Sequence, residues 1–136
     1  MAFLSFVHNK IPFNKNFLYL WPDGILAKFL VNLKKIPGRK ILSSLDPNIT
    51  SMNVYLISSK NTKNINYIKK KFKNKKFYFI EAPYGDPNFI FEKITKKVKK
   101  IRSYSLILLG LPTPKQEIIA AKISNMYQNI KIICLG

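Results

Sequence analysis

The sequence predicts an α/β fold of the Rossmann-like kind, a mainly parallel sheet with helices on both faces. Two observations carry this prediction. From residue 17 to the end, short apolar runs alternate with segments whose apolar residues recur at helical spacing. One run, residues 104–111, is almost continuously apolar, as is typical of a strand buried on both faces. A chain of 136 residues suits a single domain, and we assign residues 1–136 to one domain.

The first elements are set by turn signals. The apolar run 17–21 is a predicted strand, and the Pro-Asp-Gly sequence that follows ends it. Residues 25–35 place apolar side chains at helical spacing and therefore predict a helix, which the turn sequence at 36–40 ends. Residues 53–59 are β-branched and aromatic and predict the next strand.

The middle of the chain repeats this alternation. Residues 61–73 predict an amphipathic helix, with apolar residues at i, i+3 and i+7. Residues 76–83 predict a strand. Residues 86–101 predict a helix, because Asp86 is a good N-cap and a proline occupies the first helical position.

The last elements are a strand at 104–111, a helix at 113–129 and a second buried strand at 130–136. In parallel sheets of this kind, ligands bind beyond the carboxyl ends of the strands. Polar loops follow three of the predicted strands, at 21–24, 82–88 and 110–117.

The net charge of +18 comes from 22 Lys and 2 Arg against 6 acidic residues, with clusters at 69–77 and 93–102. Such a field attracts nucleic acid, anionic lipid or a phosphorylated substrate. Lys, Asn and Ile together supply 54 residues, however, and a compositional bias of this kind places lysines on solvated helix faces without any partner. Arg, the usual residue for bidentate phosphate and guanine contacts, is nearly absent. We therefore do not expect nucleic acid as a partner.

Several classes of site are excluded. The only cysteine, Cys134, and the only histidine, His8, cannot form a disulfide framework or a zinc cluster. No glycine-rich dinucleotide or P-loop motif follows a strand. We expect neither a metal nor a cofactor. No stretch is apolar for the length of a membrane span, and the start lacks the layout of a signal peptide.

Asp23 follows a predicted strand and precedes the flexible Gly24. The simplest interpretation is a turn in which Asp23 caps the helix that begins near residue 25. The functional interpretation is a carboxylate at the ligand crevice that takes a proton from an attacking hydroxyl, if desolvation raises its pKa. Spacing alone favours the turn.

The segment Gly110–Glu117, GLPTPKQE, carries more chemistry than a helix start needs. Capping explains most of it: Thr113 as N-cap, Pro114 at N1, Gln116 reaching back at N3 and Glu117 favoured by the helix dipole. Capping does not explain Lys115, a cation where the dipole is already positive. A bound anion such as a diphosphate would explain it. The loop at 84–88, by contrast, is accounted for by turn chemistry and capping by Asp86.

The combination of PDGI, the Arg39 of PGRKI and LLGLPTPKQE resembles the WecG/TagA/CpsF family of bacterial glycosyltransferases (glycosyltransferase family 26). The likeness covers residues 17–136, and Pro-Lys-Gln-Glu is its most specific part. The resemblance implies inverting transfer of an N-acetylmannosamine-type sugar from a UDP donor to a lipid-linked acceptor on undecaprenyl diphosphate. It implies no obligatory metal.

The resemblance also implies roles. Asp23 resembles the base for the acceptor hydroxyl, Gln116 resembles a residue of the donor pocket, and Lys115 and Glu117 belong to the same motif. Arg39 matches a family arginine loosely. Gly24, Gly110 and Pro114 complete the expected binding segments. The protein is expected in the cytoplasm, at the anionic inner face of the membrane, and a homo-oligomer is left open.

Family members are longer at both ends, so the chain is expected to be truncated relative to them. The loop that reads Tyr84-Gly85 here has the reverse order in the family. Two other interpretations therefore stay open beside the transferase. One is a non-catalytic fragment that binds a nucleotide sugar or a partner chain. The other is a basic nucleic-acid-binding protein.

Overall fold

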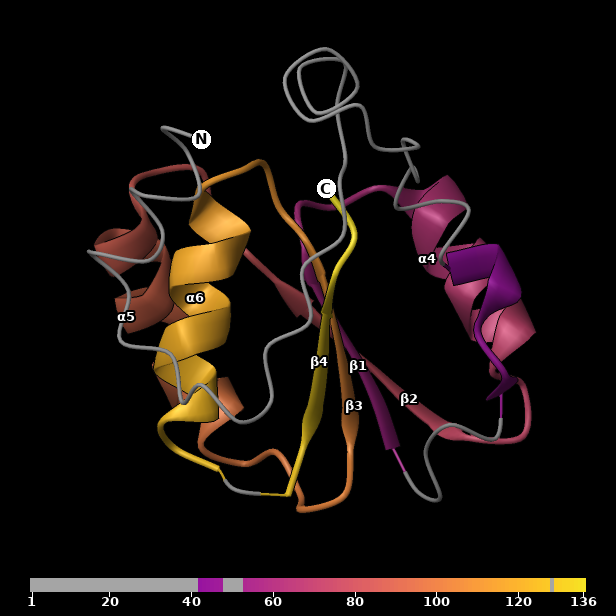
Figure 1. Ribbon diagram of the computed structural model, residues 1–136. Coiled ribbons are helices and arrows are strands. Elements are labelled where there is room, and N and C mark those ends of the chain that lie inside the picture. Colours follow the sequence, from indigo (N-terminus) through magenta and orange to yellow (C-terminus); the bar gives the residue numbers. More distant parts are fainter. Residues whose placement is uncertain (1–41, 48–52, 128) are drawn as a thin grey trace, which may run out of the picture.

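The computed structural model describes residues 42–47, 53–127 and 129–136. Within them, four strands form an all-parallel sheet in the order β2-β1-β3-β4 (Figure 1). Strands and helices alternate along the chain, which confirms the predicted α/β fold. The strands are β1 (Asn53–Ser58), β2 (Lys76–Glu81), β3 (Leu106–Gly110) and β4 (Lys131–Cys134). The helices are α4 (Thr62–Lys71), α5 (Pro87–Val98) and α6 (Lys115–Ser124).

The centre of the sheet is β1, which pairs with β2 on one side and with β3 on the other. The register sets Ser58 beside Glu81 on one side and beside Gly110 on the other, so these three strands end at the same level. All six residues of β1 are buried. Leu106–Leu109 of β3 are fully buried, as the continuous apolar run predicted.

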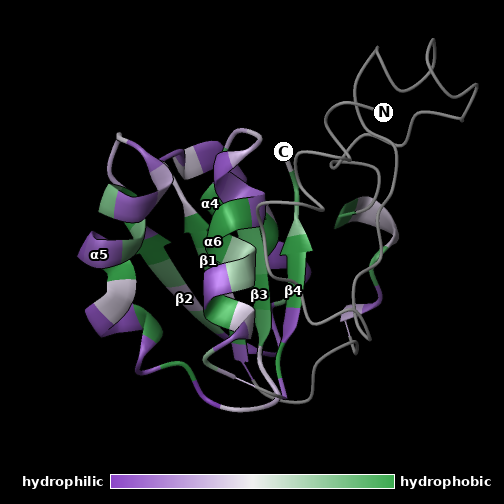
Figure 2. Cartoon of the chain, turned by 60° about the vertical axis from the view of Figure 1, so that its left-hand side comes forward, coloured by the Kyte–Doolittle hydropathy of each residue, from purple (hydrophilic) through white to green (hydrophobic). Residues whose placement is uncertain are grey.

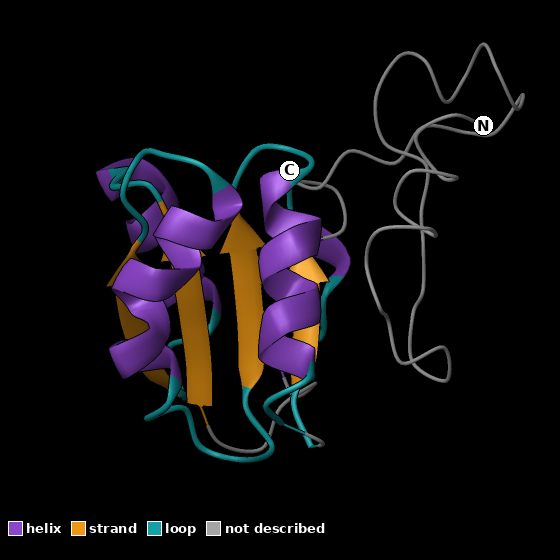
Figure 3. Ribbon diagram, turned by 90° about the vertical axis from the view of Figure 1, so that its left-hand side faces the viewer, coloured by secondary structure: helices purple, strands orange, loops and turns teal. Residues whose placement is uncertain are grey.

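The sheet has a helical layer on each face. α5 and α6 cover one face and α4 covers the other (Figure 1). Coloured by hydropathy, the strands are predominantly hydrophobic and the helices carry hydrophilic residues on their outer surfaces (Figure 2). The view from the side of α5 and α6 shows both helices in front of the strands (Figure 3). Among the described residues, no helix has the length and apolar character needed to cross a bilayer.

Two helices begin where local chemistry predicts. The Asp86 carboxylate accepts hydrogen bonds from the amides of Asn88 (2.9 Å) and Phe89 (3.1 Å), which confirms Asp86 as the N-cap of α5. The Asn61 side chain caps α4 in the same way, by accepting from the Asn64 amide (3.1 Å). In each case a side-chain oxygen satisfies amides that the first helical turn leaves without an internal partner.

The prediction for the last helix was wrong at both ends, because α6 occupies Lys115–Ser124 instead of 113–129. Pro114, not Thr113, is the N-cap, and no side chain makes a capping hydrogen bond. The Thr113 hydroxyl donates to Glu117 Oε1 (3.0 Å) and accepts from Gln116 Nε2 (3.3 Å), so it bonds to side chains and not to a helix amide. Because α6 begins at Lys115, Gln116 is the second helical residue instead of the third. At the other end, the Asn125 amide still donates to Ala121 O (3.1 Å), and the chain then turns towards β4.

The last strand is shorter and more exposed than predicted. Residues 130–136 were expected to form a buried strand, but β4 spans Lys131–Cys134 and its apolar residues are half-buried. Within the described residues β4 pairs with β3 alone, so it lies at an edge of this sheet. The predicted strand 17–21 and helix 25–35 lie outside the described residues.

Candidate functional site

The carboxyl ends of β1 and β3 form the switch point of the sheet. After β1 the chain passes to α4 on one face, and after β3 it passes to α6 on the other. This is the position where open α/β sheets bind ligands. The two strand ends approach closely, because a Cβ atom added to Gly110 would lie 3.1 Å from the Ser58 Cβ. A side chain at residue 110 would therefore require Ser58 to shift.

Lys115, the first residue of α6, contacts the loop between β2 and α5 at this edge of the sheet. Its Nζ donates to the carbonyl oxygen of Gly85 at 2.6 Å and lies 4.8 Å from the ring centroid of Tyr84. The first contact is a hydrogen bond and the second has cation–π geometry. The β2–α5 loop and the start of α6 are thereby held together, although 30 residues separate Lys115 from Gly85.

Gly85 is required by the shape of its loop. Its φ is +154°, a conformation that other residues rarely adopt. A Cβ at this position would also lie 2.6 Å from Cδ1 of Phe89, within the first turn of α5. Glycine at residue 85 therefore lets the loop carbonyl reach the Lys115 ammonium.

Gln116 is almost completely buried and uses its amide within the protein. Its Nε2 donates to Thr113 Oγ1 (3.3 Å) and to Glu117 Oε1 (3.1 Å). Its Oε1 accepts from the Gly136 amide (3.0 Å), just beyond β4. The side chain thus connects the start of α6 with the carboxyl end of β4, and its contacts in this structure are those of a positioning residue.

The Glu117 carboxylate is part of the same network. Its Oε1 accepts from the Thr113 hydroxyl (3.0 Å) as well as from Gln116. Its Oε2 is buried and, among the described residues, has no hydrogen-bond partner. Burial raises the pKa of the nearby Cys134 thiol from 9.0 to about 12, and the negative charge of Glu117 adds to this effect. Cys134 is consequently a neutral thiol at physiological pH and not a nucleophile.

Two backbone amides at the start of α6 already donate hydrogen bonds within the protein. Those of Lys115 and Gln116 both point at the carbonyl oxygen of Pro112, at 2.8 and 3.4 Å. The sequence suggested that amides at this helix start would hold an anion. The Lys115 ammonium is a cation at this helix start, and it donates to the Gly85 carbonyl oxygen.

The structure brings together five of the eight site residues predicted from the sequence. Gly110, Pro114, Lys115, Gln116 and Glu117 lie in one segment at the switch point. Asp23, Gly24 and Arg39 lie outside the described residues, and their roles stay predictions.

Sequence reasoning gave no functional role to Tyr84, Gly85 and Ser58, which the structure places at this edge. Tyr84 and Gly85 had two signals, a polar loop at a strand end, which capping by Asp86 already explained, and a dipeptide that the family has in reverse order. Ser58 carried no signal, because its proximity to Gly110 depends on strand pairing.

Within the described ranges, no group of three or more His, Cys, Asp or Glu side chains is arranged to hold a metal ion. The fold is that of a Rossmann-like α/β protein, and the switch point of its sheet is the candidate site. Comparison with protein-family models, curated protein sequences and solved structures finds no match to the chain.

Proposed function

We propose that the chain is an inverting glycosyltransferase of the WecG/TagA/CpsF type. It transfers an N-acetylmannosamine-type sugar from a UDP donor to a lipid-linked acceptor on undecaprenyl diphosphate. The support is the resemblance of the PDGI and LPTPKQE segments to that family, together with a Rossmann-like fold whose switch point lies at the second of these segments.

The observation that carries the proposal is the set of groups that surround the Lys115 ammonium. Its two contacts, a carbonyl oxygen and an aromatic ring, are both formally neutral. Among the described residues no carboxylate pairs with it, and the adjacent Glu117 is engaged with Thr113 and Gln116. Among the described residues, Lys115 is therefore a cation without a compensating carboxylate at the start of a helix, at the edge where open α/β sheets bind ligands. A diphosphate supplies the missing negative charge.

The remaining roles follow from the resemblance. Asp23 removes the proton from the acceptor hydroxyl while the hydroxyl oxygen attacks the donor sugar. UDP leaves with the electron pair of the broken glycosidic bond. Gln116 and Glu117 shape the donor pocket, with Gln116 acting through the position of α6. Gly110 and Pro114 set the path of the loop. Gly24 and Arg39 complete the site from the segment before residue 42.

Donor binding is tested with Lys115→Gln. Loss of one charged hydrogen bond to the diphosphate should weaken UDP binding about tenfold or more, as measured by titration calorimetry. The matched control is Lys122→Gln, which removes a cation from the same helix, where Lys122 lies 5.2 Å from the Phe91 ring. The control should bind UDP as wild type does. Equal affinity in all three proteins would remove the main support for the proposal.

Catalysis is tested with Asp23→Asn in a sugar-transfer assay with UDP-N-acetylmannosamine and a lipid-linked acceptor. Turnover should be lost while UDP affinity is kept, because the base contacts the acceptor and not the diphosphate. Asp86→Asn is the control: Asn also caps helices, so the turnover of this variant should match wild type. Near-normal turnover of Asp23→Asn would refute the assignment of the base. Wild-type UDP binding without any turnover would favour a non-catalytic nucleotide-sugar-binding fragment.

A further inference from the structure

The outer surface of α4 carries a set of lysines at helical spacing. Lys63, Asn66 and Lys70 fall at i, i+3 and i+7, which places them along one stripe of α4, and Lys73 follows in the turn after the helix. The opposite side of α4 buries Ile68 and packs on the sheet. We refer to five lysines on α4 and in the turn between α4 and β2 as the lysine face: Lys63, Lys69, Lys70, Lys73 and Lys75.

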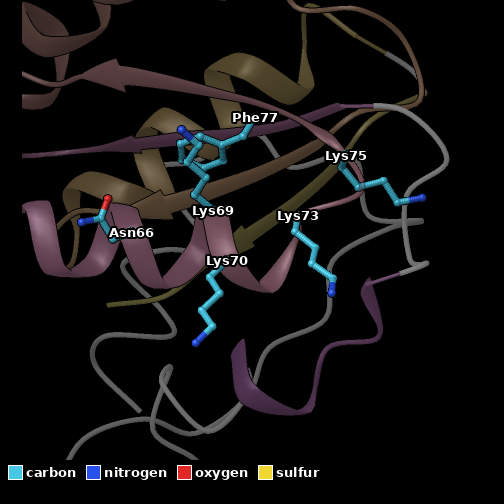
Figure 4. A pocket seen from close by; sticks show the side chains of 6 residues that line it. All are labelled: Asn66, Lys69, Lys70, Lys73, Lys75 and Phe77. Atoms are coloured by element: carbon cyan, nitrogen blue, oxygen red, sulfur yellow. The ribbon is translucent and has the colours of Figure 1, made fainter.

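Four of these lysines surround an open hollow with Asn66 and Phe77 between α4 and β2 (Figure 4). The side chains do not converge on one point. Lys70 and Lys73 point away from the sheet, Lys75 points in another direction, and Lys69 extends towards Phe77 (Figure 4). The ammonium groups are spread over α4 and the turn before β2, and this spread suits an extended anionic surface better than a compact anion.

Among the described residues, no carboxylate forms an ion pair with the lysine face. No acidic residue occurs in the sequence between Asp46 and Glu81. Within the part of the chain that the structure describes, none of the five lysine ammonium groups donates to a protein acceptor, whereas the ammonium of the neighbouring Lys71 donates to Ser43 O (3.0 Å). The field on this side of the molecule is therefore available to a partner.

We propose that the lysine face is a docking surface for an anionic lipid membrane. Polybasic surfaces gain roughly 1 kcal/mol, about fivefold in affinity, for each lysine close to such a membrane. The face contains lysine alone, without the arginines that make bidentate contacts to nucleic acid. Lysine is a hydrated point charge on a flexible stem and suits attraction to a surface of headgroups without fixed geometry.

The orientation of the docked protein rests on the proposed function, whereas membrane binding does not. Lys63 lies in the first turn of α4, just after the carboxyl end of β1, and Lys75 lies just before β2. The lysine face therefore extends along the whole length of α4, starting beside the switch point. A membrane held along α4 meets the edge where a lipid-linked acceptor must enter.

The test is co-sedimentation of the full chain with vesicles of phosphatidylglycerol and phosphatidylcholine, against vesicles of phosphatidylcholine alone. Binding should require the anionic lipid and should weaken with added salt. A lysine-face variant replaces four lysines by glutamine: Lys69, Lys70, Lys73 and Lys75. The matched control removes four lysines from the end of α5: Lys96, Lys97, Lys99 and Lys100. Circular dichroism establishes that both variants are folded.

We expect the lysine-face variant to lose roughly 100-fold or more in affinity for anionic vesicles, and the control to lose much less. Equal losses would show that net charge alone causes binding and would overturn the proposal. Wild-type vesicle binding by the lysine-face variant would also overturn the proposal. The same holds if this variant loses affinity only for a single-stranded oligonucleotide, measured in parallel. UDP binding by the lysine-face variant is expected to be unchanged, so failure of membrane docking and failure of the proposed transferase are distinguishable.

Discussion

The Cys134 thiol should react about a thousandfold more slowly in the folded chain than in the unfolded one. Burial, with a smaller contribution from Glu117, raises its pKa from 9.0 to about 12. Three pKa units lower the thiolate fraction at neutral pH roughly a thousandfold, and the thiolate is the reactive species. The assay is the rate of reaction with a chromogenic disulfide at about pH 7.5, with and without denaturant. Glu117→Gln removes the negative charge, which is the smaller cause of the raised pKa. This variant should therefore recover only a small part of the thousandfold difference in rate.

The same pKa shift predicts a loss of stability at alkaline pH. Between 9.0 and about 12 the folded chain keeps a thiol proton that the unfolded chain has lost, so the contribution of the thiol falls as the pH rises through this window. Relative to Cys134→Ala, wild type should lose about 2 kcal/mol of unfolding free energy between about pH 8 and about pH 10.5. Lysine titration is common to both proteins and cancels in this difference. A labelling rate in the folded chain within about tenfold of the rate in the unfolded chain would refute the reasoning. So would parallel profiles of unfolding free energy against pH for wild type and Cys134→Ala.

Three further substitutions test the packing and the hydrogen bonds. Leu108→Ala empties a fully buried position in β3 and should lower the unfolding free energy by about 2 to 5 kcal/mol in urea titration; a loss below about 1 kcal/mol would contradict the burial. Gln116→Leu removes a network of three hydrogen bonds and should cost about 1 to 3 kcal/mol, and wild-type stability would show that the network contributes nothing. Asp86→Ala removes the α5 cap and should lower stability by about 1 kcal/mol, whereas Asp86→Asn should retain most of it; equal losses in both would argue against capping.

The elements that local chemistry specifies could be predicted from the sequence. The cap of α5 depends on Asp86 and the proline after it, which are adjacent in the chain. The prediction of β4 as a buried strand was wrong, because an apolar run such as Ile132-Ile133 has the same composition in a central strand as in an edge strand. Position within a sheet depends on strand order, and strand order is not a local property.

The candidate site, too, could be predicted from the sequence only where local chemistry determines it. The LPTPKQE motif identified the segment that forms the switch point, but not the residue at which the helix begins. Threonine followed by proline fits an N-cap and N1 pair, as Asp86 and its proline do in α5. The Thr113 hydroxyl bonds instead to the side chains of Gln116 and Glu117, and α6 begins only after Pro114. The contact between Lys115 and Gly85 depends on two loops that the sheet brings together, so neither loop could reveal it alone.

The central position of β1 has a consequence for synthesis of the chain on the ribosome. β1 is made before both of its neighbours, and β3 is completed only at Gly110, 52 residues after Ser58. At about 5 to 20 residues per second, roughly 3 to 10 s pass between the completion of β1 and that of β3. Until β2 is completed at Glu81 both edges of this apolar strand lack a partner, and afterwards one edge does. The protein therefore depends, while it is being made, on whatever keeps nascent chains from associating through such edges.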